Sequence, residues 1–303
     1  MQIKLRLYLI LFAFFLFLID SIFVLTNSTQ ISFLILVLIL FGVPHGALDL
    51  YIDQHLHKSD SNQKIFLLKY IGNIVAYALV WYFFPIAALV IFILITAYHF
   101  GEIDWMGKTD NIIHKTAYSV IGLLWILLLL SKNVNFALEV FMRMERSAFN
   151  EKQWIHLANK IYPITLIGLF AVYAVLFFFK GLFFSKNKYY YYLIIQQLTL
   201  IVFALFMPLW LCFAFYFGFW HSLLSFDKIR ITFSMPNNFT GWKNLLIKAA
   251  PFSIMAWFGF SYITLSTLNS KDASGIFTLL FISLSVLALP HLQIFTKIKL
   301  KPD

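Results

Sequence analysis

Long apolar stretches separated by short polar segments dominate the chain. A helix that crosses a bilayer needs roughly 20 apolar residues, and proline, glycine and clusters of charge mark where such stretches end. This pattern predicts an all-α fold, a polytopic transmembrane helical bundle of about ten helices. The expected spans are 5–26, 31–52, 65–84, 86–105, 112–131, 161–180, 189–208, 210–226, 246–267 and 275–296.

Two boundaries and one segment are less regular. The breaks at Pro85 and near Pro208 could instead mark kinks within single long helices, because proline interrupts the helical hydrogen-bond ladder. Residues 132–160 mix apolar and charged side chains, which predicts an amphipathic helix on the membrane surface. Since no linker-like stretch divides the sequence, we expect residues 1–303 to form a single integral-membrane domain.

Composition supports the membrane assignment and excludes other classes. The chain is 61% hydrophobic and only 12% charged, with a mean hydropathy of +0.84, beyond the range of soluble domains. Its net charge of +10 is spread between apolar runs, so nucleic acid is not an expected partner. The positive-inside rule predicts a multi-pass protein of the cell (inner) membrane with both termini in the cytoplasm. The single cysteine, Cys212, excludes a Cys-rich metal site.

Four histidines each lie in a different apolar stretch: His45, His99, His221 and His291. They fall on the second, fourth, eighth and tenth predicted helices, at a similar distance from the cytoplasmic end. Imidazole stays neutral near pH 7 while offering a ring nitrogen to a metal, so lipid penalises it least among the usual ligands. We therefore predict one intramembrane metal site built from these four side chains.

Two carboxylates accompany these histidines. Asp49 follows His45 by four positions and Glu102 follows His99 by three, so each shares a helix face with its histidine. We expect Asp49 and Glu102 to be catalytic residues that orient a ligating imidazole and offset metal charge. The other histidines lie in predicted polar connections, where solvation is the ordinary explanation: His55, His57, His114 and His156.

The types of ligand atom narrow the choice of metal ion. Imidazoles within lipid suit iron, copper or zinc. Iron(II), Fe2+, with neutral ligands retains positive charge and keeps open positions for O2 or substrate. That property favours iron for the oxidation of an electron-rich apolar molecule.

At four places the chain resembles the Brp/Blh family of bacterial membrane β-carotene 15,15'-dioxygenases. The similar motifs are Pro44-His45-Gly46-Ala47-Leu48-Asp49, Tyr98-His99-Phe100-Gly101-Glu102-Ile103-Asp104, His221-Ser222 and Pro290-His291. The resemblance implies a non-haem iron(II) enzyme that cleaves the central double bond of β-carotene with O2 to give two molecules of all-trans retinal. It also implies that His45, His99 and His221 bind the iron.

The chain departs from the family pattern at Ser225, where the family has a further ligating histidine. His291 or a carboxylate such as Glu102 could complete the shell, the site could keep three imidazoles, or this member could lack activity. We favour His291. The expected partners are β-carotene or a related carotenoid, O2 and membrane lipid, while the oligomeric state stays open.

Two other classes fit the same residues. A membrane transporter or channel would use the histidines and Glu102 as an ion path. A haem protein would use paired histidines as axial ligands.

Overall fold

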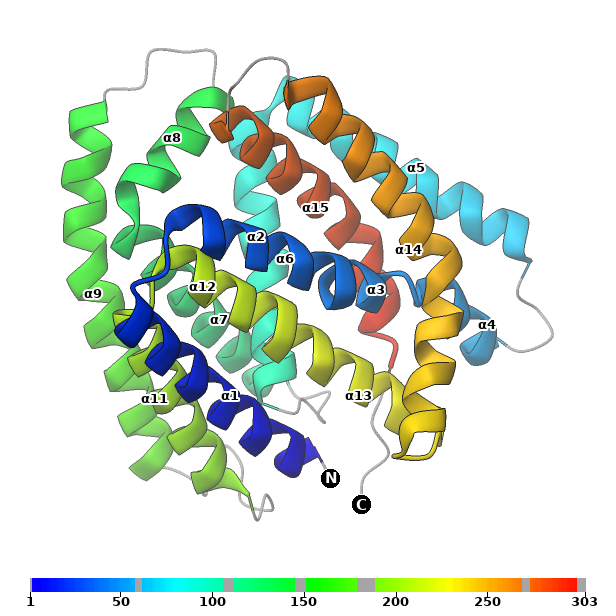
Figure 1. The fold of residues 1–303 in the computed structure, drawn as a ribbon, viewed down its shortest axis with the longest axis horizontal. Helices are drawn as coiled ribbons and strands as arrows, with labels where there is room; N and C mark the ends of the chain where they lie inside the picture. The colour runs from blue at the N-terminus through cyan, green and yellow to red at the C-terminus, as the bar shows by residue number, and fades with distance from the viewer. Residues whose placement is uncertain are drawn as a thin grey trace. The chain divides into compact units, whose positions relative to one another are not determined.

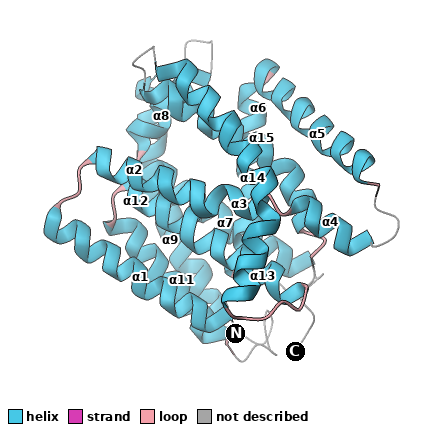
Figure 2. Ribbon diagram, turned by 45° about the vertical axis from the view of Figure 1, so that its right-hand side comes forward, coloured by secondary structure: helices cyan, strands magenta, loops and turns pink. Residues whose placement is uncertain are grey.

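The computed structural model describes residues 2–57, 62–105, 112–144, 151–178, 189–268 and 273–298. Within these ranges all regular secondary structure is helical and no strand occurs (Figure 2), so the predicted all-α fold is confirmed. The elements, labelled in Figure 1, are α1 (Gln2–Phe23), α2 (Asn27–Val37), η1 (Leu38–Gly42), α3 (Val43–Gly46), α4 (Asp49–His57), α5 (Gln63–Phe83), α6 (Pro85–Asp104), α7 (Ile112–Lys132), α8 (Val134–Met144), α9 (Glu151–Phe178), α11 (Tyr190–Phe206), α12 (Leu209–Phe213), η2 (Ala214–His221), α13 (Ser222–Thr232), α14 (Phe239–Leu268) and α15 (Ala273–Phe295).

The two prolines flagged in the sequence both separate helices. Helix α5 ends at Phe83, and Pro85 is the first residue of α6. Proline suits a first helical position because its missing N–H would have no partner there. Helix α11 ends at Phe206, and Pro208 precedes α12 as its N-cap.

The chain is a multi-pass membrane protein. In its described part, eight helices are long and apolar enough to cross a membrane, and two shorter apolar helices cover Tyr190–Phe206 and Phe281–Phe295. Many large apolar side chains on these helices are exposed, among them Ile22 at 70% and Leu68 at 74%. Such exposure would be unfavourable in water, and it is ordinary for a helix surface that faces lipid.

Two of the spans contain π-helical segments. Segment η1 directly precedes the short helix that carries His45, and segment η2 ends at His221. A π-helical turn adds a residue to the ladder and rotates the side chains that follow it, and such turns concentrate at functional sites. The apolar pattern of the sequence does not reveal them.

Helix α13 extends beyond its predicted end. The sequence places Lys228 and Arg230 in a polar connection, whereas both side chains are buried within α13. The guanidinium of Arg230 lies 2.7 Å from a carboxylate oxygen of Asp227. Arg230 is thus paired with a buried acid within the protein, and the ammonium of Lys228 lies 4.6 Å from the centre of the Phe295 ring. These two cations therefore do not mark a loop.

The predicted surface segment, 132–160, divides between two helices. Its first part forms α8, whose buried residues include Leu138 and Val140. Residues 145–150 lie outside the described part of the chain, and the remainder begins α9. The location of α8 at a membrane surface stays a prediction.

Clustering of contacts divides the chain into two compact units. The first comprises residues 1–38, 96–138 and 150–224. In it α7 packs against α9, α2 packs against α12 and η2, and α1 packs against α11. Figure 1 shows α1 and α11 side by side near the amino terminus.

Glycines allow the closest helix contacts of the first unit. A Cβ added at Gly122 on α7 would lie 1.9 Å from the backbone oxygen of Ala97 on α6, and one at Gly101 on α6 would lie 2.0 Å from that of Tyr118 on α7. Because backbone atoms fill the space, only glycine permits this approach. The contact fixes the part of α6 that carries His99.

The second unit comprises residues 39–95, 139–149 and 225–303. Here α15 packs against α5, α4 and α14, and α14 also packs against α3. Tyr77 and Trp81 of α5 form a small core with Ala88 and Val286, and the Tyr77 hydroxyl donates to the carbonyl of Ala88 at 2.7 Å.

Candidate metal centre

His45 is held in one ring orientation by the backbone before it. It follows Pro44 in α3, and its Nδ1 bonds the carbonyl oxygen of Gly42 at 2.5 Å. A carbonyl oxygen can only accept, so Nδ1 carries the proton and the lone pair lies on Nε2. A neutral imidazole with its proton fixed on one nitrogen is a form ready to bind a metal through the other.

His291 lies beside His45 in the second unit. Their ring centroids are 5.1 Å apart and the rings are nearly perpendicular, at 89°. Nδ1 of His291 donates to Oδ1 of Asp49 at 2.8 Å, and the hydroxyl of Tyr70 donates to Oδ2 of the same carboxylate at 2.9 Å. The Asp49 carboxylate is therefore bonded to the imidazole of His291, whereas the sequence pairs it with His45 on the same helix face.

Tyr70 also lines a cavity of about 610 Å³ in the second unit. The cavity wall is mixed, with charged side chains such as Asp53 and Lys69 beside apolar ones such as Phe66. The Tyr70–Asp49–His291 series therefore runs from this cavity to the imidazole beside His45. The cavity is lined by Asp53, Asn62, Ile65, Phe66, Lys69, Tyr70, Gly72, Asn73, Pro290, Gln293, Ile294 and Lys297.

The first unit holds the second pair of histidines. His99 lies on α6 and His221 ends η2, and their ring centroids are 4.7 Å apart at an angle of 75°. Phe100 packs against the His221 ring at 4.6 Å, and Phe217 stacks on it at 5.9 Å. These aromatic contacts restrict the His221 ring and keep water from it.

An acid near the pair forms a hydrogen-bonded network that the sequence interpretation missed. Oδ2 of Asp104 accepts from the Tyr216 hydroxyl and Oδ1 from Nε1 of Trp220, each at 2.8 Å. The guanidinium of Arg6 donates to the carbonyl oxygens of Ile103 and Asp104 at 2.6 and 2.8 Å. The sequence pattern does not single out Arg6, yet its side chain is fully buried.

The other residues considered in the sequence analysis also have defined places on the helices. Glu102 is buried on α6, three positions after His99, and Ser225 is buried on α13, one turn after His221. His55 and His156 are exposed on helices rather than in connections. The side chain of His57 lies outside the described part of the chain.

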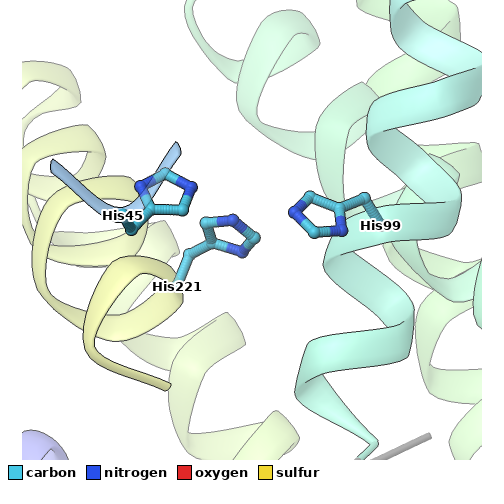
Figure 3. A group of neighbouring side chains, drawn as sticks. All are labelled: His45, His99 and His221. Carbon is cyan, nitrogen blue, oxygen red and sulfur yellow. The ribbon is translucent and has the colours of Figure 1, made fainter. Parts of the chain in front are cut away.

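The three histidines that the resemblance assigns to iron form one buried group. One ring nitrogen from each of His45, His99 and His221 lies within 4.8 Å of the others (Figure 3), so the group could hold a metal ion. Three imidazoles without a thiolate suit the borderline metals iron, copper and zinc. His291 is not a member of this group, and its Nδ1 is bonded to Asp49.

Fold and site together define a multi-pass membrane protein with buried histidines able to bind a metal. The chain belongs to the family of beta-carotene 15,15'-dioxygenases, whose family model matches residues 36–299. This match confirms the resemblance seen in the motifs, and it covers all four histidines of the predicted site. The family is one of carotene-cleaving enzymes.

Comparison with curated protein sequences and with solved structures returned no match.

Proposed function

We propose that this protein cleaves β-carotene at its central 15,15' double bond with O2, giving two molecules of all-trans retinal. The iron(II) that this reaction needs would be held by His45, His99 and His221. The observation that carries the proposal is the buried group of three imidazoles in a chain of the carotene dioxygenase family.

The donor chemistry of the group fits iron(II). Each of the three imidazoles binds a metal in its neutral form. Three imidazoles occupy fewer coordination positions than iron(II) accepts, which leaves room for O2 or substrate. When bound, the iron would supply the redox chemistry that allows O2 to react with a carbon–carbon double bond. The reaction balances without a further reductant, because one double bond and one O2 yield two carbonyl groups.

The protein residues hold the ligands and keep the centre dry. The bond from His45 to Gly42 leaves Nε2 to face a metal, and the rings of Phe100 and Phe217 enclose His221. Exclusion of water protects reactive species from side reactions. A carotene dissolves in the bilayer core, so the apolar surface of the spans gives it access without crossing water.

Asp49, Glu102 and His291 act around this centre. We assign to the carboxylates of Asp49 and Glu102 the role of offsetting the positive charge of the metal, since isolated charge is costly in lipid. Asp49 also fixes the ring of His291. In this proposal three imidazoles bind the metal, and His291 supports the position of His45 through their ring contact.

We also place the protein in the inner membrane of the cell, with β-carotene or a related carotenoid and O2 as its reactants. Cations at the ends of the spans, such as Lys64 at the start of α5 and Lys115 at the start of α7, support cytoplasmic exposure of those ends.

The test is expression in cells that produce β-carotene. Cells with the wild-type chain should lose colour and accumulate retinal, whereas cells with His99→Ala should keep their carotene. His156→Ala is the matched control because this histidine is exposed on α9. Unaltered carotene beside well-folded wild-type protein would refute the proposal, and ion flux in proteoliposomes without bound iron would favour a transporter.

A further inference from the structure

We propose that Asp104 is a positioning residue that fixes the separation of His99 and His221. The inference rests on the proposed function, because it assigns Asp104 a role in the same metal centre. All the residues that carry it belong to the first unit.

The position of Asp104 in the chain links the two histidines. It follows His99 by five positions on α6, while its partners Tyr216 and Trp220 precede His221 by five positions and one on η2. Each carboxylate oxygen accepts one 2.8 Å bond from η2. The end of α6 is thereby tied at two points to the segment that presents His221.

The surroundings of the carboxylate make these bonds strong and hard to replace. Asp104 is only 1% exposed, so water does not compete for its oxygens, and a hydrogen bond to an ionised group is among the strongest available. Arg6 donates to the last carbonyls of α6 and its guanidinium lies 5.6 Å from the centre of the Trp220 ring. The positive charge of Arg6 offsets the negative charge of the Asp104 carboxylate.

The π-helical form of η2 explains why such a tie is needed. A π-helix is rare and occurs mostly as single turns within α-helices, so we expect contacts from outside the segment to hold η2 in this form. Packing of Gly218 against Val37 supports η2 on α2: a Cβ at Gly218 would lie 2.1 Å from the Val37 side chain. Asp104 supplies the polar contact toward α6. Loss of this contact would let η2 relax and would move His221 relative to His99.

Two substitutions at Asp104 distinguish a positioning role from a purely structural one, because they differ in the hydrogen bonds that they keep. The indole N–H of Trp220 can only donate, but the hydroxyl of Tyr216 can donate or accept. In Asp104→Asn, the amide oxygen would accept from Trp220 while the amide nitrogen donates to Tyr216, so both ties survive. In Asp104→Leu both ties are lost at similar volume.

The experiment uses the purified full-length protein with cobalt(II), whose visible spectrum reports ligand number and geometry independently of activity. We expect Asp104→Leu and Trp220→Phe to weaken cobalt binding by about tenfold or more, by analogy with residues that orient metal ligands, and to change the spectrum. Asp104→Asn should restore the wild-type spectrum. Trp81→Phe, a buried tryptophan of the second unit, is the matched control.

Wild-type cobalt affinity and spectrum in Asp104→Leu would overturn the positioning role. If that variant fails to fold, Trp220→Phe and Tyr216→Phe carry the same test, and unchanged spectra in both would overturn it. Failure of the proposed function looks different: wild-type protein would bind no cobalt, or His99→Ala would bind it as well as wild type does.

Discussion

Nδ1 of His291 donates a hydrogen bond to Oδ1 of Asp49 at 2.8 Å, although the two residues are 242 positions apart in the chain. Asp49 stands four positions after His45, and the sequence alone pairs it with that imidazole. The structure gives the orienting carboxylate to His291 and the Gly42 carbonyl to His45. The rings of His45 and His291 thus each have their own acceptor for Nδ1.

Replacement of Asp49 should impair the centre without removing a proposed ligand. We expect Asp49→Ala to lower retinal formation by about tenfold to a hundredfold, because a freely rotating His291 no longer supports His45. The readout is retinal per unit of membrane protein in carotene-producing cells. Asp20→Ala on α1 is the control, and an Asp49→Ala enzyme as active as this control would contradict the assignment.

Tyr70→Phe should have a smaller effect than Asp49→Ala. It removes one of two bonds to the carboxylate and leaves the His291 contact in place. We expect a loss of about 1 kcal/mol in stability and only a partial loss of retinal formation. Thermal unfolding in detergent and product analysis measure the two effects. Tyr82→Phe, at an exposed position, provides the comparison, and equal behaviour of both variants would show that the Tyr70 hydroxyl is dispensable.

Gly122→Ala should destabilise the first unit. The new Cβ would meet the backbone of Ala97 at 1.9 Å, so α6 and α7 would have to separate, at a cost of roughly 1–3 kcal/mol or more. His99 would move with α6, so metal content should fall as well. Gly72→Ala is the matched control because nothing lies within 4 Å of its Cβ position. Equal unfolding temperatures for the two variants would contradict the close helix contact.

Ser225→Ala should leave metal binding intact. In the described part of the chain the buried Ser225 hydroxyl has no hydrogen-bond partner, and a serine hydroxyl is a poor iron(II) ligand. Its removal relieves a desolvation cost, so we expect equal or higher stability, by up to about 1 kcal/mol. The measurement is the iron content per protein molecule of the purified variant. His221→Ala, which should lose its iron, provides the comparison. Loss of iron in Ser225→Ala would make the serine a ligand.

Much of the fold follows from apolar length and proline position, since a spanning segment must satisfy its own backbone as a helix. The same logic identifies four histidines, because polar side chains within such segments stand out: His45, His99, His221 and His291. It does not show that His291 lies outside the group formed by the other three. The partners of Asp104 do not follow, since Tyr216 and Trp220 lie 112 and 116 positions away and read as ordinary membrane aromatics. The π-helical turns leave no mark on hydropathy either.

Purified wild-type protein loaded with iron(II) under anaerobic conditions and then given β-carotene and O2 should form two molecules of retinal for each carotene consumed. His45→Ala, His99→Ala and His221→Ala should each lose both the iron and the product, whereas His156→Ala should keep them. Full retinal formation by any one of these three ligand variants would contradict a centre built on the three imidazoles.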